Sequence, residues 1–136
     1  MKIIILMILV LTSSSNLSKI DKIYIYFDGY SCISCQPGIV FAFGSLSELG
    51  LGDKIILVNK HKKEKYLKYN LKLIKENSNN YIVKNISNDT TFTNNMDYFK
   101  PILIKLNNNK QIVIERNGVP YTKEKWSDLL VEKLKN

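Results

Sequence analysis

The stretch "IYIYFD", from Ile23 to Asp28, places the strongest limit on how this chain can fold. Its β-branched and aromatic residues favour a β-strand. Successive side chains of a strand point to opposite faces, and here isoleucine and phenylalanine alternate with tyrosine, so both faces are bulky. A strand with two apolar faces belongs in the middle of a covered sheet.

Strand and helix patterns alternate through the rest of the chain. Apolar side chains at helical spacing predict a helix from Cys35 or Pro37 to Leu49, which Gly50 and Gly52 end. Thr122 is placed to cap a last helix with Trp126 on its apolar face. The other expected elements are a strand at 54–59, a helix at 60–76, a short strand at 81–83, a polar loop at 85–100, and a hairpin of strands at 101–106 and 111–116. This order predicts an α/β fold with a mixed central sheet flanked by helices.

The first residues predict export. Lys2 is followed by an apolar stretch from Ile3 to Leu11 and then by small polar residues, which is the layout of a secretory signal peptide. We expect residues 1–15 to be this leader, with cleavage near Ser15 or Asn16, and residues 16–136 to be one domain. The alternative is an uncleaved anchor or a buried strand, although the apolar stretch is short for a bilayer span. In a periplasmic or other extracytoplasmic compartment a disulfide can persist.

The two cysteines, Cys32 and Cys35, stand between the predicted strand and the predicted helix. A thiol at a helix N-terminus meets unpaired N–H groups and the helix dipole, which favour the thiolate and lower the pKa. A second thiol one turn further on can attack the mixed disulfide that the first one forms. Cys32 is therefore the candidate nucleophile and Cys35 the candidate resolving thiol.

Other uses of the pair stay open. Structural zinc needs four ligands, and the chain offers only the two cysteines and His61, with Asp28 as a weak fourth. Copper needs fewer ligands, so the cysteines and His61 could form a soft site. A structural disulfide is also possible, although its short loop would add little stability. We expect no bound metal and no cofactor.

The formal net charge of +8 raises the question of nucleic acid. Base and phosphate recognition relies on arginine forks, and Arg116 is the only arginine in the chain. We therefore expect no nucleic-acid partner. Protein thiols or disulfides and a redox partner protein are the expected partners of a monomer without a stable membrane span.

The chain resembles the thioredoxin-like superfamily, and most of all its exported bacterial thiol–disulfide oxidoreductases. The segment "YFDGYSCISC" is similar to the strand, turn and C-x-x-C motif of that family, and "FKPILIKLNNNKQIVIERNG" is similar to its later proline, hairpin and glycine. The resemblance covers residues 20–136. It implies that Pro101 follows a cis peptide bond and packs against the cysteine pair. It also implies that Lys100 offers backbone groups to an extended substrate, and that Asp28 assists proton transfer.

Two positions depart from the family pattern. Ser31 stands where the family usually has tryptophan, and Ser34 stands where it often has proline. The residues between the cysteines supply no cation to stabilise the Cys32 thiolate further, and a strong oxidant needs a strongly stabilised thiolate. The sequence thus predicts a reductase or a weak exchanger. The alternatives are a non-catalytic thioredoxin-like binding module with a static disulfide, and a copper-handling protein.

Overall fold

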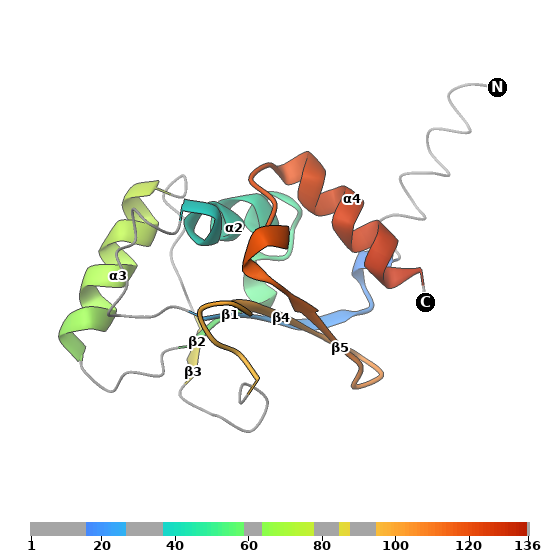
Figure 1. The fold of residues 1–136 in the computed structure, drawn as a ribbon, viewed down its shortest axis with the longest axis horizontal. Helices are drawn as coiled ribbons and strands as arrows, with labels where there is room; N and C mark the ends of the chain where they lie inside the picture. Colours follow the sequence, from blue (N-terminus) through green and yellow to red (C-terminus); the bar gives the residue numbers. More distant parts are fainter. Residues whose placement is uncertain (1–15, 27–36, 59–63, 78–84, 88–94, 136) are drawn as a thin grey trace.

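The computed structural model describes residues 16–26, 37–58, 64–77, 85–87 and 95–135, which form one mixed sheet with helices packed on it (Figure 1). The strand order is β3-β2-β1-β4-β5. The predicted α/β fold with a mixed sheet is confirmed at this level. The elements are β1 (Ile20–Tyr26), α2 (Pro37–Glu48), η2 (Gly52–Lys54), β2 (Ile55–Val58), α3 (Glu64–Asn77), β3 (Asn85–Ser87), β4 (Ile102–Leu106), β5 (Gln111–Ile114), η3 (Arg116–Gly118) and α4 (Lys123–Leu134).

β1 is the central strand, as its two apolar faces predict. It runs parallel to β2, with Ile23 opposite Ile55, and antiparallel to β4, with Tyr24 opposite Leu103. Residues directly opposite one another share a face of the sheet. The alternation along β1 therefore separates two apolar layers, one on each side.

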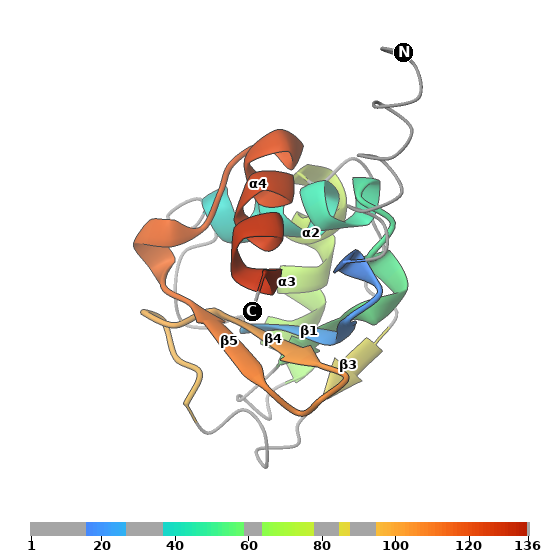
Figure 2. The same ribbon diagram turned by 90° about the vertical axis from the view of Figure 1, so that its right-hand side faces the viewer.

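The described helices all cover one face of the sheet (Figures 1 and 2). Side chains of α2, α3 and α4 share one core cluster with Ile23 and Ile25, and Trp126 and Phe43 are its largest fully buried members. The opposite face forms a second, smaller cluster of Tyr24, Tyr26, Ile56, Val58, Leu103 and Met96. Among the described residues, no helix contributes to this second cluster. We call these two sides the helix face and the outer face.

An irregularity at the start of β1 explains why Ile20 belongs to the helix face. Ile20 pairs with Leu106, but Lys22 pairs with Lys105, so the register shifts between them. Such a bulge adds one residue to a strand and reverses the facing of the side chains beyond it. Ile20 and Ile23 can therefore both enter the helix-face core, although they stand three positions apart.

The helix ends follow the predicted signals. Gly50 has a positive φ of 81°, and its N–H donates to the carbonyl of Ser47 while that of Leu51 donates to Leu46. This is the Schellman pattern, which favours glycine because it needs left-handed backbone. Thr122 accepts a hydrogen bond from the N–H of Lys125 at 3.2 Å, so the predicted cap of α4 is confirmed.

Part of the predicted polar loop is a strand. Asn85–Ser87 pairs parallel to β2, with Leu57 opposite Ile86. Asn85 and Ser87 have little intrinsic strand preference, although Ile86 favours a strand, and pairing with a neighbouring strand outweighs propensity at a sheet edge. A short, polar edge strand also discourages pairing with other chains. The predicted strand at 81–83 lies outside the described residues.

The predicted leader, residues 1–15, also lies outside the described residues. Within the part of the chain that the structure describes, no helix is long and apolar enough to cross a bilayer.

Candidate active site

The structure describes the residues on either side of residues 27–36, which we call the cysteine segment. Asp28, Cys32 and Cys35 lie within residues 27–36, outside the described residues, as does His61. Tyr26 ends the central strand immediately before that segment, and Pro37 begins α2 immediately after it. The segment therefore starts at the carboxyl end of β1, and its last residue adjoins the first turn of a 12-residue helix.

Pro101 lies beside the end of β1. The N–H of Tyr26 donates to the Pro101 carbonyl at 2.7 Å, and Pro101 is buried. β4 begins at the next residue, and its Ile102 pairs with Ile25. Pro101 is thus held at the end of the strand that leads into the cysteine segment. Its predicted contact with the cysteines involves residues that the structure does not describe.

The predicted cis bond before Pro101 is wrong. No peptide bond is cis among the residues that the structure describes, and Lys100 and Pro101 are both among them. The trans form is the favoured state of an X–Pro bond. Here a side chain helps the chain to turn, because Asp97 Oδ1 accepts the N–H groups of Phe99 at 2.8 Å and Lys100 at 2.9 Å. Such an aspartate turn redirects the backbone into β4 without a cis bond.

The backbone of Lys100 is engaged within this turn. Its N–H also lies 3.2 Å from the Asp97 carbonyl, and its own carbonyl accepts the Asp97 N–H at 3.3 Å. The Lys100 side chain is exposed. An extended substrate that pairs with the Lys100 backbone would have to replace contacts made by Asp97, so this part of the predicted groove stays a prediction.

An aromatic and cationic cluster reinforces the turn, and the sequence did not reveal it. The Arg116 guanidinium lies over the Tyr98 ring, 3.8 Å from its centroid, and Tyr98 meets Phe99 edge-to-face with ring centroids 5.3 Å apart. The Arg116 N–H donates to the Phe99 carbonyl at 2.8 Å. Cation–π and edge-to-face contacts are both favourable. The cluster therefore connects the start of η3, which follows β5, to the residues before Pro101. The Phe99 side chain stays 70% exposed.

Tyr121 lies over the first turn of α2. Its ring atoms are 3.4–3.5 Å from the position that a Cβ on Gly38 would occupy. Gly38 is the second residue of the helix, and the Tyr121 side chain is 59% exposed. The ring therefore packs on the helix end that adjoins the cysteine segment. The only sequence signal was the turn "NGVPYT" before the last helix, which gave no hint of this contact.

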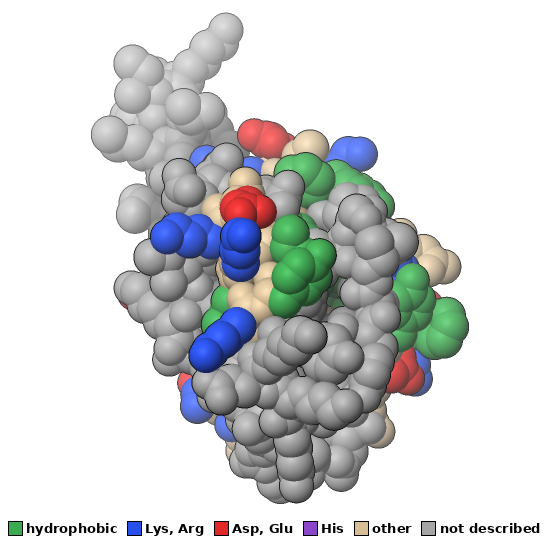
Figure 3. Space-filling model, turned by 90° about the vertical axis from the view of Figure 1, so that its left-hand side faces the viewer, with side chains coloured by type: hydrophobic (Ala, Val, Ile, Leu, Met, Phe, Trp, Pro, Cys, Tyr) green, Lys and Arg blue, Asp and Glu red, His purple; other side chains and the backbone are tan. Residues whose placement is uncertain are grey.

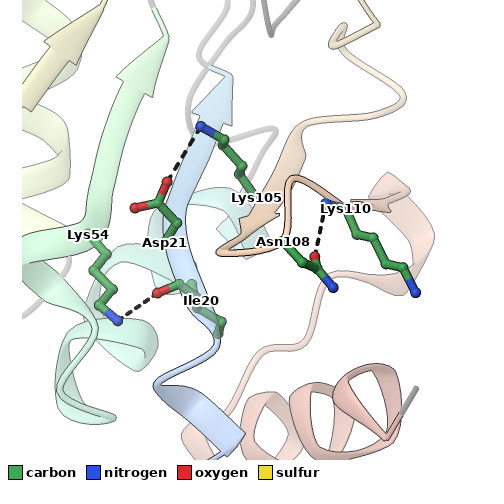
Figure 4. A network of polar contacts seen from close by, with 6 residues as sticks. All are labelled: Ile20, Asp21, Lys54, Lys105, Asn108 and Lys110. Atoms are coloured by element: carbon green, nitrogen blue, oxygen red, sulfur yellow. Dashed lines mark hydrogen bonds and ion pairs between the residues drawn. The ribbon is translucent and has the colours of Figure 1, made fainter.

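A shallow hollow of about 240 Å³ lies at the other end of the sheet, between the start of β1 and the C-terminus of α4. Its lining residues are Lys19, Leu106, Asn107, Asn108 and Leu134. Nearby polar contacts join the strands (Figure 4): Lys54 Nζ donates to the Ile20 carbonyl at 2.6 Å, and Lys105 Nζ lies 3.5 Å from Asp21 Oδ2. Lys110 N–H donates to Asn108 Oδ1 at 3.0 Å in the β4–β5 turn. These contacts are structural and lie away from Pro101.

Comparisons with protein-family models, with curated proteins and with solved structures found no match.

Proposed function

We propose that this chain is an exported, thioredoxin-like thiol–disulfide oxidoreductase that works through Cys32 and Cys35. The observation that carries the proposal is the hydrogen bond from Tyr26 to Pro101. It joins the end of the central strand, just before the cysteine segment, to the proline that opens β4. The sheet order β2-β1-β4-β5, with parallel and antiparallel partners on the two sides of β1, supports the same proposal.

The proposed reaction transfers two electrons to a disulfide of a partner protein. The Cys32 thiolate attacks one sulfur of that disulfide, which forms a mixed disulfide and releases the first partner thiolate. The Cys35 thiolate then attacks the Cys32 sulfur and releases the second partner thiolate. The Cys32–Cys35 pair ends oxidised and the partner ends as a dithiol, after the released thiolates take up protons. A redox partner protein restores the dithiol by the same exchange in reverse.

The roles of the two thiols can be separated with single variants. Cys35→Ser removes the resolving attack, so a mixed disulfide with partner proteins should accumulate and appear on non-reducing gels. Cys32→Ser removes the nucleophile, so no adduct should form. Ser34→Ala is the matched control, because it changes a neighbouring residue of similar size without touching sulfur. Adducts through Cys35 alone would reverse the two roles.

The same variants distinguish the alternatives. If neither cysteine variant forms an adduct and the wild type cannot reduce insulin disulfides, the chain is a binding module with a static disulfide. Copper that is retained by the wild type and lost from both variants would favour copper handling. N-terminal sequencing of protein from the native host should begin near Asn16, and intact Met1 in a cytosolic fraction would contradict export.

Two exposed aromatic rings border the proposed site and are the surfaces that a protein substrate would meet. Phe99 stands two residues before Pro101, and Tyr121 packs on the first turn of α2. Immobile aromatic side chains give contact area at low entropy cost. Phe99→Ala and Tyr121→Ala should therefore raise KM for a protein disulfide several-fold while leaving the rate with a small disulfide unchanged. Val113→Ala, an exposed apolar change on β5, is the control. Equal effects on both substrates would contradict this role.

A further inference from the structure

α3 carries a row of three lysines on its solvent side. Lys68, Lys72 and Lys75 are spaced four and three residues apart, which places them next to one another along one side of a helix. All three are exposed. The opposite side of the same helix is occupied by Ile74, which is fully buried in the helix-face core. The packing of α3 against the protein therefore leaves the row exposed to solvent.

An exposed aromatic side chain lies beside this row. Tyr69 is 60% exposed. Figure 3 views the molecule from the side on which α3 lies, and there blue basic side chains, with a red acidic one among them, lie next to green hydrophobic side chains. Among the side chains of α3 that the structure describes, which do not include Glu64, Glu76 is the acidic one, and its Oε1 lies 3.9 Å from Lys72 Nζ. The Lys72 and Glu76 side chains are 74% and 53% exposed, so water screens their attraction and this pair holds Lys72 only weakly.

The residue types favour a lipid surface over nucleic acid. Lysine is a compact, hydrated charge without the fork that arginine offers to phosphates and bases, and α3 contains no arginine. Tyrosine suits the boundary between headgroups and acyl chains, because its ring is apolar and its hydroxyl is polar. We propose that the exposed side of α3 docks this protein on a membrane rich in anionic lipid. The lysine row meets the headgroup phosphates and Tyr69 lies at headgroup depth.

The size of the effect follows from the charges. A lysine near an anionic membrane strengthens binding about fivefold, so the row together contributes on the order of a hundredfold. Screening shortens the reach of these charges to about 8 Å at physiological ionic strength. Binding should therefore weaken steeply as salt is added. This docking is independent of disulfide exchange, since it uses none of the residues proposed for the site.

The experiment is sedimentation of the mature chain with sucrose-loaded vesicles. Vesicles of phosphatidylglycerol and phosphatidylcholine should capture the protein at low salt, and vesicles of phosphatidylcholine alone should not. The triple variant Lys68→Gln/Lys72→Gln/Lys75→Gln should lose on the order of a hundredfold in affinity. The control variant Lys123→Gln/Lys125→Gln/Lys133→Gln removes the same charge from exposed positions of α4 and should keep most of the binding.

A spectroscopic reporter tests the depth of docking. Trp126 is the single tryptophan of the chain and is fully buried, so its emission should change little. In a Tyr69→Trp variant the new emission should shift to the blue when the anionic vesicles are added. If both triple variants lost the same affinity for the vesicles, or if the Tyr69→Trp emission did not shift, the proposal would be overturned. Binding would then depend on the net charge of the protein and not on α3. Duplex DNA or RNA that outcompetes the vesicles for α3 would overturn it in favour of nucleic acid.

Discussion

The two faces of the sheet are built differently, although they share the same strands. On the helix face, three helices bury a continuous core that includes Trp126 and Phe43. On the outer face the described cluster is small, and Met96, which precedes the Asp97 turn, is its only member from outside the strands. The contrast indicates that stability comes mainly from the helix face. The outer face holds Met96, which anchors the turn before Pro101, and Pro101 lies at the end of β1.

The largest effect should come from the helix face. Trp126→Ala removes a fully buried indole and should lower the free energy of unfolding by about 4 kcal/mol. Urea denaturation followed by circular dichroism measures this. Trp126→Phe is the control. The indole Nε1 of Trp126 is buried and has no hydrogen-bond partner among the described residues, so replacing the indole with a phenyl ring removes no hydrogen bond to them. A loss below about 1 kcal/mol for the alanine variant would contradict the proposed dominance of this face.

A middle-sized effect is expected from the outer face. Met96 is 1% exposed and packs in the second cluster. Met96→Ala should lower the free energy of unfolding by about 2 kcal/mol, at the low end for a buried methionine, because no described helix packs on this cluster. Met96→Leu keeps the volume and should cost less than about 1.5 kcal/mol. The same denaturation experiment compares them, and a cost for Met96→Ala equal to that of Trp126→Ala would remove the contrast between the faces.

The smallest effects come from two neighbours on β5 that point to opposite faces. Ile112 is partly buried against the helix-face core, whereas Val113 is 39% exposed. Ile112→Thr should cost about 1 to 2 kcal/mol, since a hydroxyl enters an apolar contact, and Val113→Thr should stay within about 0.5 kcal/mol. Both substitutions replace one β-branched residue with another, so the strand preference of the position changes little in either variant. Chemical denaturation of the pair measures the difference, and the reverse ranking would mean that the faces of β5 are wrongly assigned.

Local patterns predicted most of the elements. The two-faced apolar run of β1, the helical spacing in α2, and the Thr122 cap of α4 all depend on residues close in sequence, so their signals can be read directly. β3 was not predicted, because a single isoleucine between two polar residues gives no local strand pattern and the segment becomes a strand by pairing with β2. The bulge beside Ile20 likewise arises from pairing with β4.

The surroundings of the candidate site were less predictable. The family resemblance predicted that Pro101 packs against the cysteine pair and follows a cis bond. The cysteines lie outside the described residues, so the contact stays a prediction, and the bond before Pro101 is not cis. The contact between Arg116 and Tyr98 joins residues 18 positions apart (116 − 98), and no local periodicity reports such a pair. Tyr121 over Gly38 is still more distant in sequence. Long-range contacts of this kind depend on how elements pack, which the order of residues alone does not reveal.

The central place of β1 has a consequence for how the chain acquires its fold. β1 is the first of the described strands along the chain, yet one of its two partners is β4, in which Ile104 pairs with Ile23 from about 80 residues away. Such long-range pairing is slow to form, and unpaired apolar strands are prone to aggregation in the meantime. During synthesis, the strand "IDKIYIY" therefore has one unpaired edge until β4 and β5 have been made. Truncation before β4 should therefore yield insoluble protein instead of a smaller folded domain.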